Sequence, residues 1–344
     1  MLNNDIQYNI SLQPFNTFGI SAVANQLISI KQVSKLQQLI SNKILIDKPV
    51  FILGGGSNIL LKNNFQGIVL KMDILGKNVV QENENHVWVK VGGGENWHEF
   101  VLWTLANNYF GIENLSLIPG TVGASPIQNI GAYGVELKDV FHELEAINLQ
   151  TGQSATFSHQ ACQFGYRNSI FKNEIKGQFC ITSVVFKLSK MPQLHIKYGA
   201  IRRELEATNV SENQWTPKMV SDIVIAIRSS KLPDPAQIGN SGSFFKNPEI
   251  PLAQFKALQK KFSNIVFYEL PNDMIKVPAG WLIEQCGWKG KRIGNTGTYK
   301  NQALVLVNHG NATGAEIYQL SSDILESVQQ KFGITLSREV NIIE

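Results

Sequence analysis

The chain has 344 residues, and its 31 Lys and Arg against 27 Asp and Glu give a formal net charge of +4. Hydrophobic residues make up 43% and charged residues 17%, which is typical of a folded chain and excludes a disordered one. The length predicts two or three domains, because it exceeds what one compact core usually holds. The small positive excess is not gathered into a basic run, so we expect no nucleic-acid partner and no membrane partner.

The cysteines and histidines form no metal or dithiol motif. Cys162, Cys180 and Cys286 stand far apart without a C-x-x-C pair, and such sparse usage is typical of a reducing compartment. The six histidines show no paired metal spacing. The first ten residues are polar and the longest apolar runs have strand length. We therefore expect a cytoplasmic protein with no signal peptide, no membrane span and no metal.

Strand-like and helix-like stretches alternate along the chain, which favours a mixed α and β fold. The continuous apolar runs at 50–53 and 68–70 predict buried strands, and the apolar–polar alternation of 86–92 predicts a half-buried strand. Pro217 and Pro251 each precede apolar residues at helical spacing, and both predict helix starts.

A third helix has sequence signals at both ends. Thr313 and Glu316 form a T-x-x-E capping box, and apolar residues recur on one face as far as Phe332. Gly333 can end this helix in a left-handed conformation.

Two changes in composition predict domain boundaries. One is the polar stretch at 71–85, and the other is the segment KLPDP at 231–235. We therefore expect domains at 1–75, 76–230 and 231–330, with the tail 331–344 packing back on the first domain.

Three glycines directly follow the predicted strand 50–53, in the sequence GGGSN at 54–58. Such a loop offers backbone N–H groups with no Cβ in the way, and Ser57 and Asn58 can add hydrogen bonds, which is how loops bind phosphate. The loop matches neither G-x-G-x-x-G nor the P-loop pattern. A tight turn at a domain edge is the alternative interpretation.

A second glycine-rich run, IPGTVGASPIQNIGAYG at 118–134, is long, apolar and poor in charge. Loops normally face water, so this one predicts a cover, for which a flat uncharged aromatic ligand would serve. An internal crossover between domains is the alternative. A third run, GNSGSFFKNP at 239–248, places Ser241 and Ser243 among glycines, which is also typical of a simple turn.

These runs belong to a set of motifs through which the chain resembles the UDP-N-acetylenolpyruvoylglucosamine reductases, flavoenzymes of bacterial cell-wall synthesis, in their longer type I form. The motifs follow the family's order almost from end to end. They are PFNTFGI (14–20), ILGGGSNIL (52–60), GGGENWHEFV (92–101), LIPGTVGASPIQNIGAYG (117–134), CQFGYRNSIFK (162–172), KYG (197–199), RSSKLPDP (228–235), GNSGSFFKNP (239–248), AGWLIEQCGWKG (279–290) and LSREV (336–340).

The resemblance implies a fold and a cofactor. The fold would be α+β, with an FAD-binding fold of the vanillyl-alcohol-oxidase type in two domains and a third α+β domain for the substrate. FAD would be bound non-covalently, and NADPH would be the co-substrate. The residues expected at the FAD pyrophosphate are Gly54, Gly55, Gly56, Ser57 and Asn58, and those expected along the flavin are Ile118, Ser125, Gly131 and Tyr133.

The resemblance also implies a reaction in two halves. NADPH would reduce FAD and be replaced by UDP-N-acetylglucosamine enolpyruvate, whose enolpyruvyl C3 would accept hydride from flavin N5. Arg167 would hold the substrate carboxylate, Glu339 would hold or share a proton, and Ser243 would give the proton to C2. The product would be UDP-N-acetylmuramate, a peptidoglycan precursor. Ser241 competes with Ser243 as the candidate proton donor.

Four further residues match the family's substrate-binding positions. Tyr198 and Lys231 would clamp the diphosphate of the substrate, while Asn247 and Gln285 would complete the polar lining. We expect a monomer, because the sequence predicts no helix with an exposed apolar face that a partner would cover.

The tail departs from the family's pattern at two positions. Arg338 stands where a proline is common, and Asn341 stands where some relatives carry an arginine. These departures bear on the contacts of the tail and leave the match of Glu339 intact.

Two other functions stay open. One is an FAD-dependent oxidase of the same fold that uses O₂ on an alcohol or sugar, which has no use for Tyr198, Lys231 and the GSFFKNP segment. The other is a non-catalytic protein that binds flavin or a UDP-sugar. In such a protein the candidate catalytic residues would be the first to be replaced by other residue types.

Overall fold

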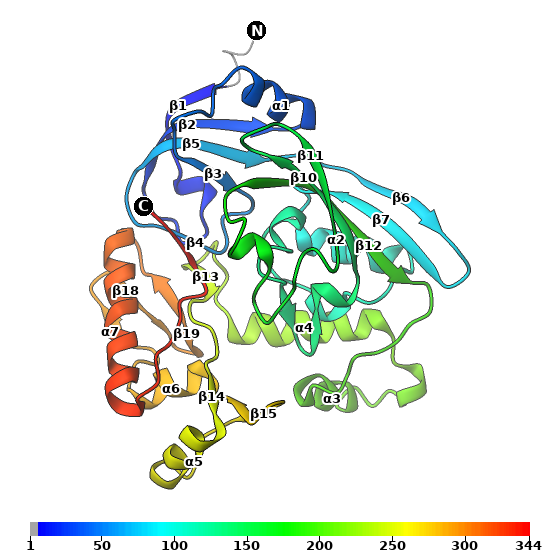
Figure 1. The fold of residues 1–344 in the computed structure, drawn as a ribbon. Helices are drawn as coiled ribbons and strands as arrows, with labels where there is room; N and C mark the ends of the chain where they lie inside the picture. Colours follow the sequence, from blue (N-terminus) through cyan, green and yellow to red (C-terminus); the bar gives the residue numbers. More distant parts are fainter. Residues whose placement is uncertain (1–5) are drawn as a thin grey trace. The chain divides into compact units, whose positions relative to one another are not determined.

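The computed structural model describes residues 6–344 (Figure 1). The expectation of no signal peptide rests on the first ten residues, and five of these lie outside the described residues. The chain forms two compact units. Unit 1 comprises the chain up to Ile10, Ala24–Gly55 and Gln66–Arg228, and unit 2 comprises Ser11–Val23, Gly56–Phe65 and Ser229–Glu344. The expected division into three domains stays a prediction.

The first sheet of unit 1 has the strand order β1-β2-β5-β3, and its strands are β1 (Ile6–Ser11), β2 (Val23–Ile30), β5 (Phe65–Met72) and β3 (Val50–Leu53). Helix α1 (Val33–Ser41) packs on it through an apolar cluster that also contains Ile147 and Cys180 of the second sheet. The prediction of a buried strand at 68–70 is confirmed, and β3 occupies 50–53 but is half-buried except at Leu53.

The second sheet of unit 1 is antiparallel, with the order β11-β10-β12-β7-β6. Its strands are β11 (Ser154–Ser158), β10 (Phe141–Asn148), β12 (Phe179–Ser189), β7 (His86–Gly92) and β6 (Lys77–Glu82). Strand β7 matches the predicted range, and its alternation is confirmed at Val87, Val89 and Val91, which are buried, whereas Lys90 on the other face is partly exposed. Trp88, on the opposite face to Val87 and Val89, is also buried, because His142 and Lys187 cover its ring.

One helix of unit 1 packs on this sheet, and two others follow the sheet in the chain. Helix α2 (Trp97–Ala106) buries Trp97 and Phe100 in the sheet's core, while α3 (Gly199–Glu206) and α4 (Pro217–Lys231) share a small core of their own. The short 3-10 turns η3 (Glu113–Leu115) and η4 (Val122–Ala124) and the hairpin β8 (Gly131–Ala132) with β9 (Val135–Glu136) lie in the glycine-rich region. The helix predicted to begin at Pro217 is confirmed.

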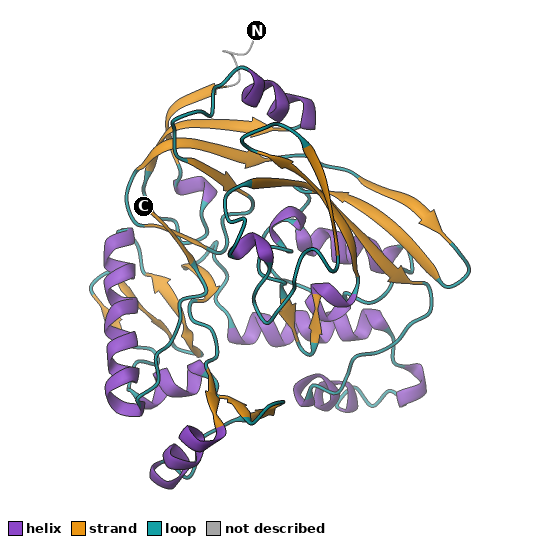
Figure 2. Cartoon of the chain, viewed as in Figure 1, coloured by secondary structure: helices purple, strands orange, loops and turns teal. Residues whose placement is uncertain are grey.

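Unit 2 is also a mixture of helices and strands (Figure 2). Its main sheet has the order β13-β19-β18-β17, and its strands are β13 (Gly239–Ser243), β19 (Gln302–Asn308), β18 (Thr296–Tyr299) and β17 (Arg292–Ile293). Helices α6 (Ala279–Gln285) and α7 (Gly314–Phe332) pack against β19, as Figure 1 shows.

Smaller elements complete unit 2. The strands β14 (Glu249–Pro251), β16 (Met274–Lys276) and β15 (Tyr268–Leu270) form a sheet beside α5 (Leu252–Lys261). The last strand, β20 (Asn341–Ile343), pairs in parallel with β4 (Ile59–Leu61). The tail of the chain therefore belongs to the same unit as the strand that follows the GGGSN loop.

The two helix signals in the C-terminal part of the sequence are confirmed. Pro251 is the N-cap of α5, and α7 begins at a capping box in which the N–H of Thr313 donates to Glu316 at 2.7 Å and the N–H of Glu316 donates to the Thr313 hydroxyl at 3.2 Å. Gly333 ends α7 with φ of +65°. Within residues 6–344, no helix combines the length and apolar character needed to cross a bilayer.

We expect Gly314→Ala to destabilise the protein, although alanine normally favours a helix. A Cβ at Gly314 would lie 1.8 Å from the carbonyl oxygen of Leu61, so α7 and β4 would have to separate, at a cost of about 1–3 kcal/mol. A Cβ at Gly199 meets nothing within 4 Å, so Gly199→Ala should leave stability unchanged or raise it by up to about 1 kcal/mol. Urea unfolding of both variants at equal FAD loading tests this, and equal effects would contradict it.

Candidate active site

The loop Gly54–Asn58 follows β3 and carries a row of available backbone donors. Among the residues that the structure describes, the N–H groups of Gly54, Gly55, Gly56 and Ser57 donate to no other protein group. Gly56 has φ of +63°, which lets successive N–H groups turn toward one side. A row of this kind binds an anionic group such as a phosphate.

Within unit 1, only glycine fits at the start of this loop. A Cβ at Gly54 would lie 2.5 Å from the Thr121 hydroxyl, and a Cβ at Gly55 would lie 2.8 Å from the Cα of Gly120. The Thr121 hydroxyl is buried and has no hydrogen-bond partner in the described part of the chain. The predicted phosphate loop and the predicted flavin loop therefore lie against each other, with an unsatisfied donor beside them. These features fit a bound dinucleotide such as FAD.

Within unit 2, the PFNTFGI motif supports the other half of the loop. A Cβ at Gly56 would lie 2.0 Å from the carbonyl oxygen of Phe15, and the N–H of Thr17 donates to the Gly56 carbonyl at 3.1 Å. Asn16 holds the motif in shape, because its amide donates to Leu12 and its carbonyl accepts from Ile20. This explains why the motif accompanies the glycine loop although it lies about forty residues earlier.

The GGGENW segment holds the 118–134 loop by backbone hydrogen bonds. The N–H of Gly123 donates to Gly93 at 2.9 Å, and the N–H of Val122 donates to Glu95 at 2.9 Å. The hydroxyl of Ser125 is buried and donates to Val122 at 2.6 Å, so its proton is used inside the loop. Ile118 is half-buried against the core of the second sheet. Protein atoms thus cover much of this loop.

Arg167 lies against the β8–β9 hairpin. Its guanidinium donates to the Gly131 carbonyl at 2.6 Å, and a Cβ at Gly131 would lie 3.1 Å from the same guanidinium. Arg167 and Tyr133 have φ of +49° and +50°, a left-handed conformation that costs energy for such side chains. The structure therefore brings together the predicted residues Gly131, Tyr133 and Arg167, and it holds them under strain that is typical of functional sites.

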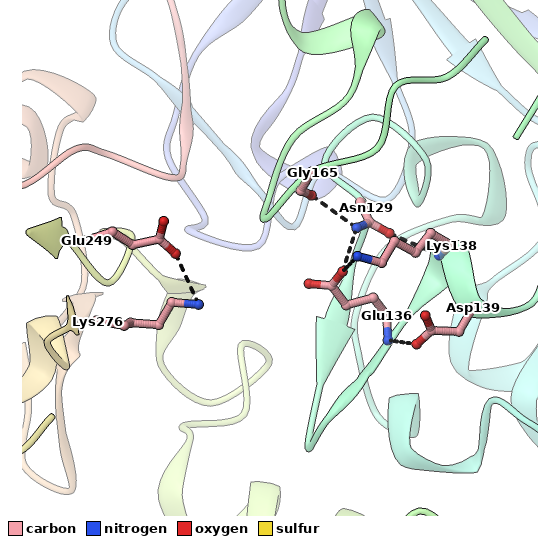
Figure 3. Close-up of polar contacts among 7 residues, drawn as sticks. All are labelled: Asn129, Glu136, Lys138, Asp139, Gly165, Glu249 and Lys276. Atoms are coloured by element: carbon pink, nitrogen blue, oxygen red, sulfur yellow. Dashed lines mark hydrogen bonds and ion pairs between the residues drawn. The ribbon is translucent and has the colours of Figure 1, made fainter. Parts of the chain in front are cut away.

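Asn129 connects Gly165 with Glu136 and Lys138 (Figure 3). Its amide donates to the Gly165 carbonyl at 3.1 Å and to the Glu136 carboxylate at 3.0 Å, and its own carbonyl accepts from the N–H of Lys138 at 3.0 Å. Glu136 also pairs with the Lys138 ammonium at 2.9 Å. Asn129 is fully buried, so this network fixes the hairpin that Arg167 touches.

The sequence analysis missed Arg228, which lies in the same cluster. Its side chain donates to the Leu117 carbonyl at 3.3 Å and to Tyr133. Burial lowers the pKa of Arg228, and the nearby charge of Arg167 lowers that pKa further, whereas Tyr133 raises it. Two guanidinium groups in one partly desolvated cluster favour an anionic ligand. The helical spacing of Val224 and Ile227 already indicated that position 228 faces inward.

Tyr198 and Lys231 are the two residues predicted to bind the diphosphate. Tyr198 contacts the cluster, and Lys231 follows it in the chain. Tyr198, at the start of α3, is exposed and packs edge-to-face on Tyr133, with ring centroids 5.2 Å apart. Lys231 is exposed at the end of α4, one helical turn after Arg228. Both side chains are thus exposed to solvent.

The two serines of the third glycine-rich run have opposite environments in unit 2. Ser243 is exposed at the end of β13, whereas Ser241 is 6% exposed and its hydroxyl has no partner among the described residues. A bulge lies between them, because the pairing of β13 with β19 shifts register between Asn240 and Ser243. Of these two serines, Ser243 is the one whose side chain is exposed to solvent.

The tail places Glu339 next to the strand that carries Ser243. The N–H of Glu339 donates to the Phe244 carbonyl at 2.8 Å, and the N–H of Lys246 donates to the Ser337 carbonyl at 2.9 Å. Residues 337–339 are thus paired antiparallel with 244–246. Two predicted catalytic residues that lie about one hundred positions apart in sequence are neighbours in unit 2.

Asn247 and Gln285 lie at the two ends of α6. The Asn247 carbonyl accepts from the N–H of Ala279 at 2.9 Å, and Gln285 is the last residue of the helix. In the same unit, Glu249 pairs with Lys276 at 3.2 Å (Figure 3). The side-chain oxygen of Asn247 is thus used at the start of α6.

Two of the three thiols are buried in the protein core. Burial raises the pKa of Cys162 and of Cys180 to about 12, which leaves both thiols unreactive. Among residues 6–344 no three metal-ligating side chains gather into a cluster.

Glu113 gives a pH-dependent prediction. Burial raises the pKa of this carboxyl above its usual 4.5, so the folded state keeps a proton that the unfolded chain has released. The free energy of unfolding should therefore fall as pH rises from about 4.5 through the folded-state pKa. Glu113→Gln should flatten this decline relative to the parent chain in urea unfolding at several pH values. Identical pH dependence in the two proteins would contradict the prediction.

Comparisons with known proteins identify the family of the chain. A family model described as the C-terminal domain of UDP-N-acetylenolpyruvoylglucosamine reductase matches residues 234–343, and a model described as an FAD binding domain matches 26–158. A relative named UDP-N-acetylenolpyruvoylglucosamine reductase from Flavobacterium johnsoniae is 52% identical over 98% of this chain and 100% of its own length. Another of that name from Amoebophilus asiaticus is 49% identical over 99% and 100%.

The fold comparison gives the same result. The crystal structure of the reductase from Thermus caldophilus matches with a TM-score of 0.68 at 20% identity, covering 97% of this chain and 98% of that one. The expected α+β fold with an FAD-binding part is therefore confirmed. With near-complete coverage at about half identity, the chain belongs to the family of UDP-N-acetylenolpyruvoylglucosamine reductases.

Proposed function

We propose that this protein reduces UDP-N-acetylglucosamine enolpyruvate to UDP-N-acetylmuramate in peptidoglycan precursor synthesis, with FAD as cofactor and NADPH as co-substrate. The observation that carries the proposal is the pairing of residues 337–339 with 244–246, which makes Glu339 a neighbour of the Ser243 strand. A proton donor and a carboxyl group on adjacent paired segments suit a reaction that must deliver one proton to carbon.

FAD, when bound, supplies the hydride that it has received from NADPH. The N–H groups of Gly54–Ser57 hold its pyrophosphate, and Asn58 adds a polar side chain at the end of the loop. Ile118, Ser125, Gly131 and Tyr133 lie along the flavin. Supporting this assignment, the buried Thr121 hydroxyl without a partner lies next to Gly54.

Arg167 binds the carboxylate of the enolpyruvyl group. A guanidinium forms two parallel hydrogen bonds to a carboxylate, and these strengthen as negative charge develops on it during hydride transfer. Arg228 adds a second positive charge near Arg167. Since both side chains belong to one cluster with Tyr133, the cluster stabilises an anion that water would otherwise solvate.

Ser243 gives its proton to C2, and Glu339 holds a proton in the same site. A serine hydroxyl is a weak acid, but a carbanionic carbon is a strong base, so the transfer is favourable when the two atoms are in reach. An ionised carboxylate at position 339 would repel the developing negative charge, so its protonated form is the competent one.

Tyr198, Lys231, Asn247 and Gln285 bind the UDP part of the substrate. Lys231 contributes a point charge to the diphosphate, and the exposed Tyr198 can close over it. We further propose three domains with the boundaries given above, a monomer, and a cytoplasmic location, which suits three free cysteines and nucleotide-linked substrates. Neither a nucleic acid nor a membrane is a partner in this proposal.

An anaerobic spectral titration tests the proposal against the oxidase alternative. We expect the flavin absorbance of the FAD-loaded protein to bleach with NADPH and to return when UDP-N-acetylglucosamine enolpyruvate is added, with UDP-N-acetylmuramate identified by mass spectrometry. Recovery of the absorbance with O₂ alone would favour the oxidase. A protein that takes up no FAD would overturn the proposal.

Ser243→Ala should separate the two half-reactions. Flavin reduction by NADPH should proceed at the parent rate, while reoxidation by the enolpyruvyl substrate should slow by about 10²–10⁴, which is typical for loss of a positioned acid. Stopped-flow absorbance measures both steps. Ser241→Ala is the matched control: it removes a buried hydroxyl without a partner and should keep both steps and the melting temperature. The reverse pattern would assign the proton to Ser241.

A further inference from the structure

We propose that Arg338 is a positioning residue for Glu339. Its side chain fixes the rotation of the tail segment, so that the Glu339 carboxyl keeps its direction toward the reacting centre. The inference rests on the proposed role of Glu339 and concerns the position at which this sequence departs from the family's common proline.

The guanidinium of Arg338 contacts three side chains of α7. Its Nε donates to the Ser321 hydroxyl at 2.7 Å, its Nη2 donates to the Ser322 hydroxyl at 2.7 Å, and its Cζ lies 4.3 Å from the centre of the Tyr318 ring. Both serine hydroxyls in turn donate to the Tyr318 carbonyl, at 2.6 and 3.1 Å. Each hydroxyl is thus oriented as an acceptor, which strengthens its bond to the arginine.

The backbone of Arg338 lies in an isolated β-bridge and not in a regular strand. Arg338 stands opposite Phe245 as an isolated bridge, and the hydrogen bonds come from its neighbours: Glu339 donates to Phe244, and Lys246 donates to Ser337. These two bonds hold the segment on either side of Arg338, and the contacts of its side chain with α7 add a further attachment between them. Successive side chains of an extended segment point to opposite sides. Holding Arg338 on α7 therefore directs Glu339 away from α7.

A second cation keeps the tail attached independently of Arg338. The ammonium of Lys62 lies 4.6 Å from the centre of the same Tyr318 ring, and it pairs with Glu344 at 2.8 Å. Strand β20, between Arg338 and Glu344, remains paired with β4. Loss of the Arg338 side chain should therefore alter the direction of Glu339 without releasing the tail.

The test compares half-reactions of FAD-loaded variants. In Arg338→Met, which keeps an apolar stem but loses the hydrogen bonds, NADPH should reduce the flavin at the parent rate. Reoxidation by the enolpyruvyl substrate should slow by about 10–100-fold, the effect expected when a reacting group is displaced by about 1 Å. The pH dependence of reoxidation, which Glu339→Gln should abolish, should also shift. Arg338→Lys, which keeps the positive charge and one donor nitrogen, should recover part of the rate of reoxidation.

Lys62→Met is the matched control, because it removes the other cation from the Tyr318 ring without touching the residue next to Glu339. It should leave reoxidation at the parent rate. If Arg338→Met unfolds or loses FAD, Ser322→Ala, which removes one acceptor of the arginine, should show the slowed reoxidation instead. Parent-like reoxidation and pH dependence in the Arg338 variants, with Glu339→Gln impaired, would overturn the inference alone. Parent-like reoxidation in Glu339→Gln would overturn the role of Glu339 itself, and the inference with it.

Discussion

The row of backbone N–H groups at Gly54–Ser57 is the constraint on which the rest of the site depends. These donors are available because the strand β3 ends there and the chain turns through glycines that approach other backbone segments closely. In unit 1 the neighbour is the stretch at Gly120 and Thr121, and in unit 2 it is the PFNTFGI motif. A side chain at any of the three glycines would displace a support of the loop.

The neighbouring loops contain strained backbone conformations and a buried polar group without a partner among the described residues. A bound ligand would offset their energetic cost. Tyr133 and Arg167 have left-handed backbones, and the Thr121 hydroxyl is buried without a partner in the described chain. Arg228 is desolvated within reach of the charge of Arg167. Such costs persist where the surrounding structure enforces them, and here Asn129 and its hydrogen bonds do so. Such a cluster suits the anionic ligand that we propose for it.

The sequence predicted the elements whose signals are local. The capping box at Thr313 and the prolines at 217 and 251 mark helix starts by chemistry that needs no distant contact, and all three are confirmed. Strand 86–92 was predicted as half-buried because its pattern alternates, but the cover of Trp88 comes from residues about fifty and one hundred positions away. Burial of a face is a tertiary property, and alternation alone does not determine it.

The same distinction separates the site residues. Gly54 and Gly55 stand in a motif whose residue types already suggest their chemistry, and the resemblance supplied Arg167, Ser243 and Glu339. Arg228 was missed although it begins a quoted motif, because an arginine on a helix usually faces water. Asn129 and Arg338 act only through partners that the fold brings together: Gly165 and Glu136 for the first, and α7 for the second.

The flavin preference of Gly55→Ala tests the central claim most directly. FAD and riboflavin share the flavin ring, but only FAD carries the pyrophosphate that the loop is expected to hold. We predict that the parent chain binds FAD far more tightly than riboflavin in fluorescence titrations, and that Gly55→Ala loses at least about tenfold of that difference, while Gly199→Ala keeps it. A Gly55→Ala protein with the parent's full preference for FAD would contradict the account.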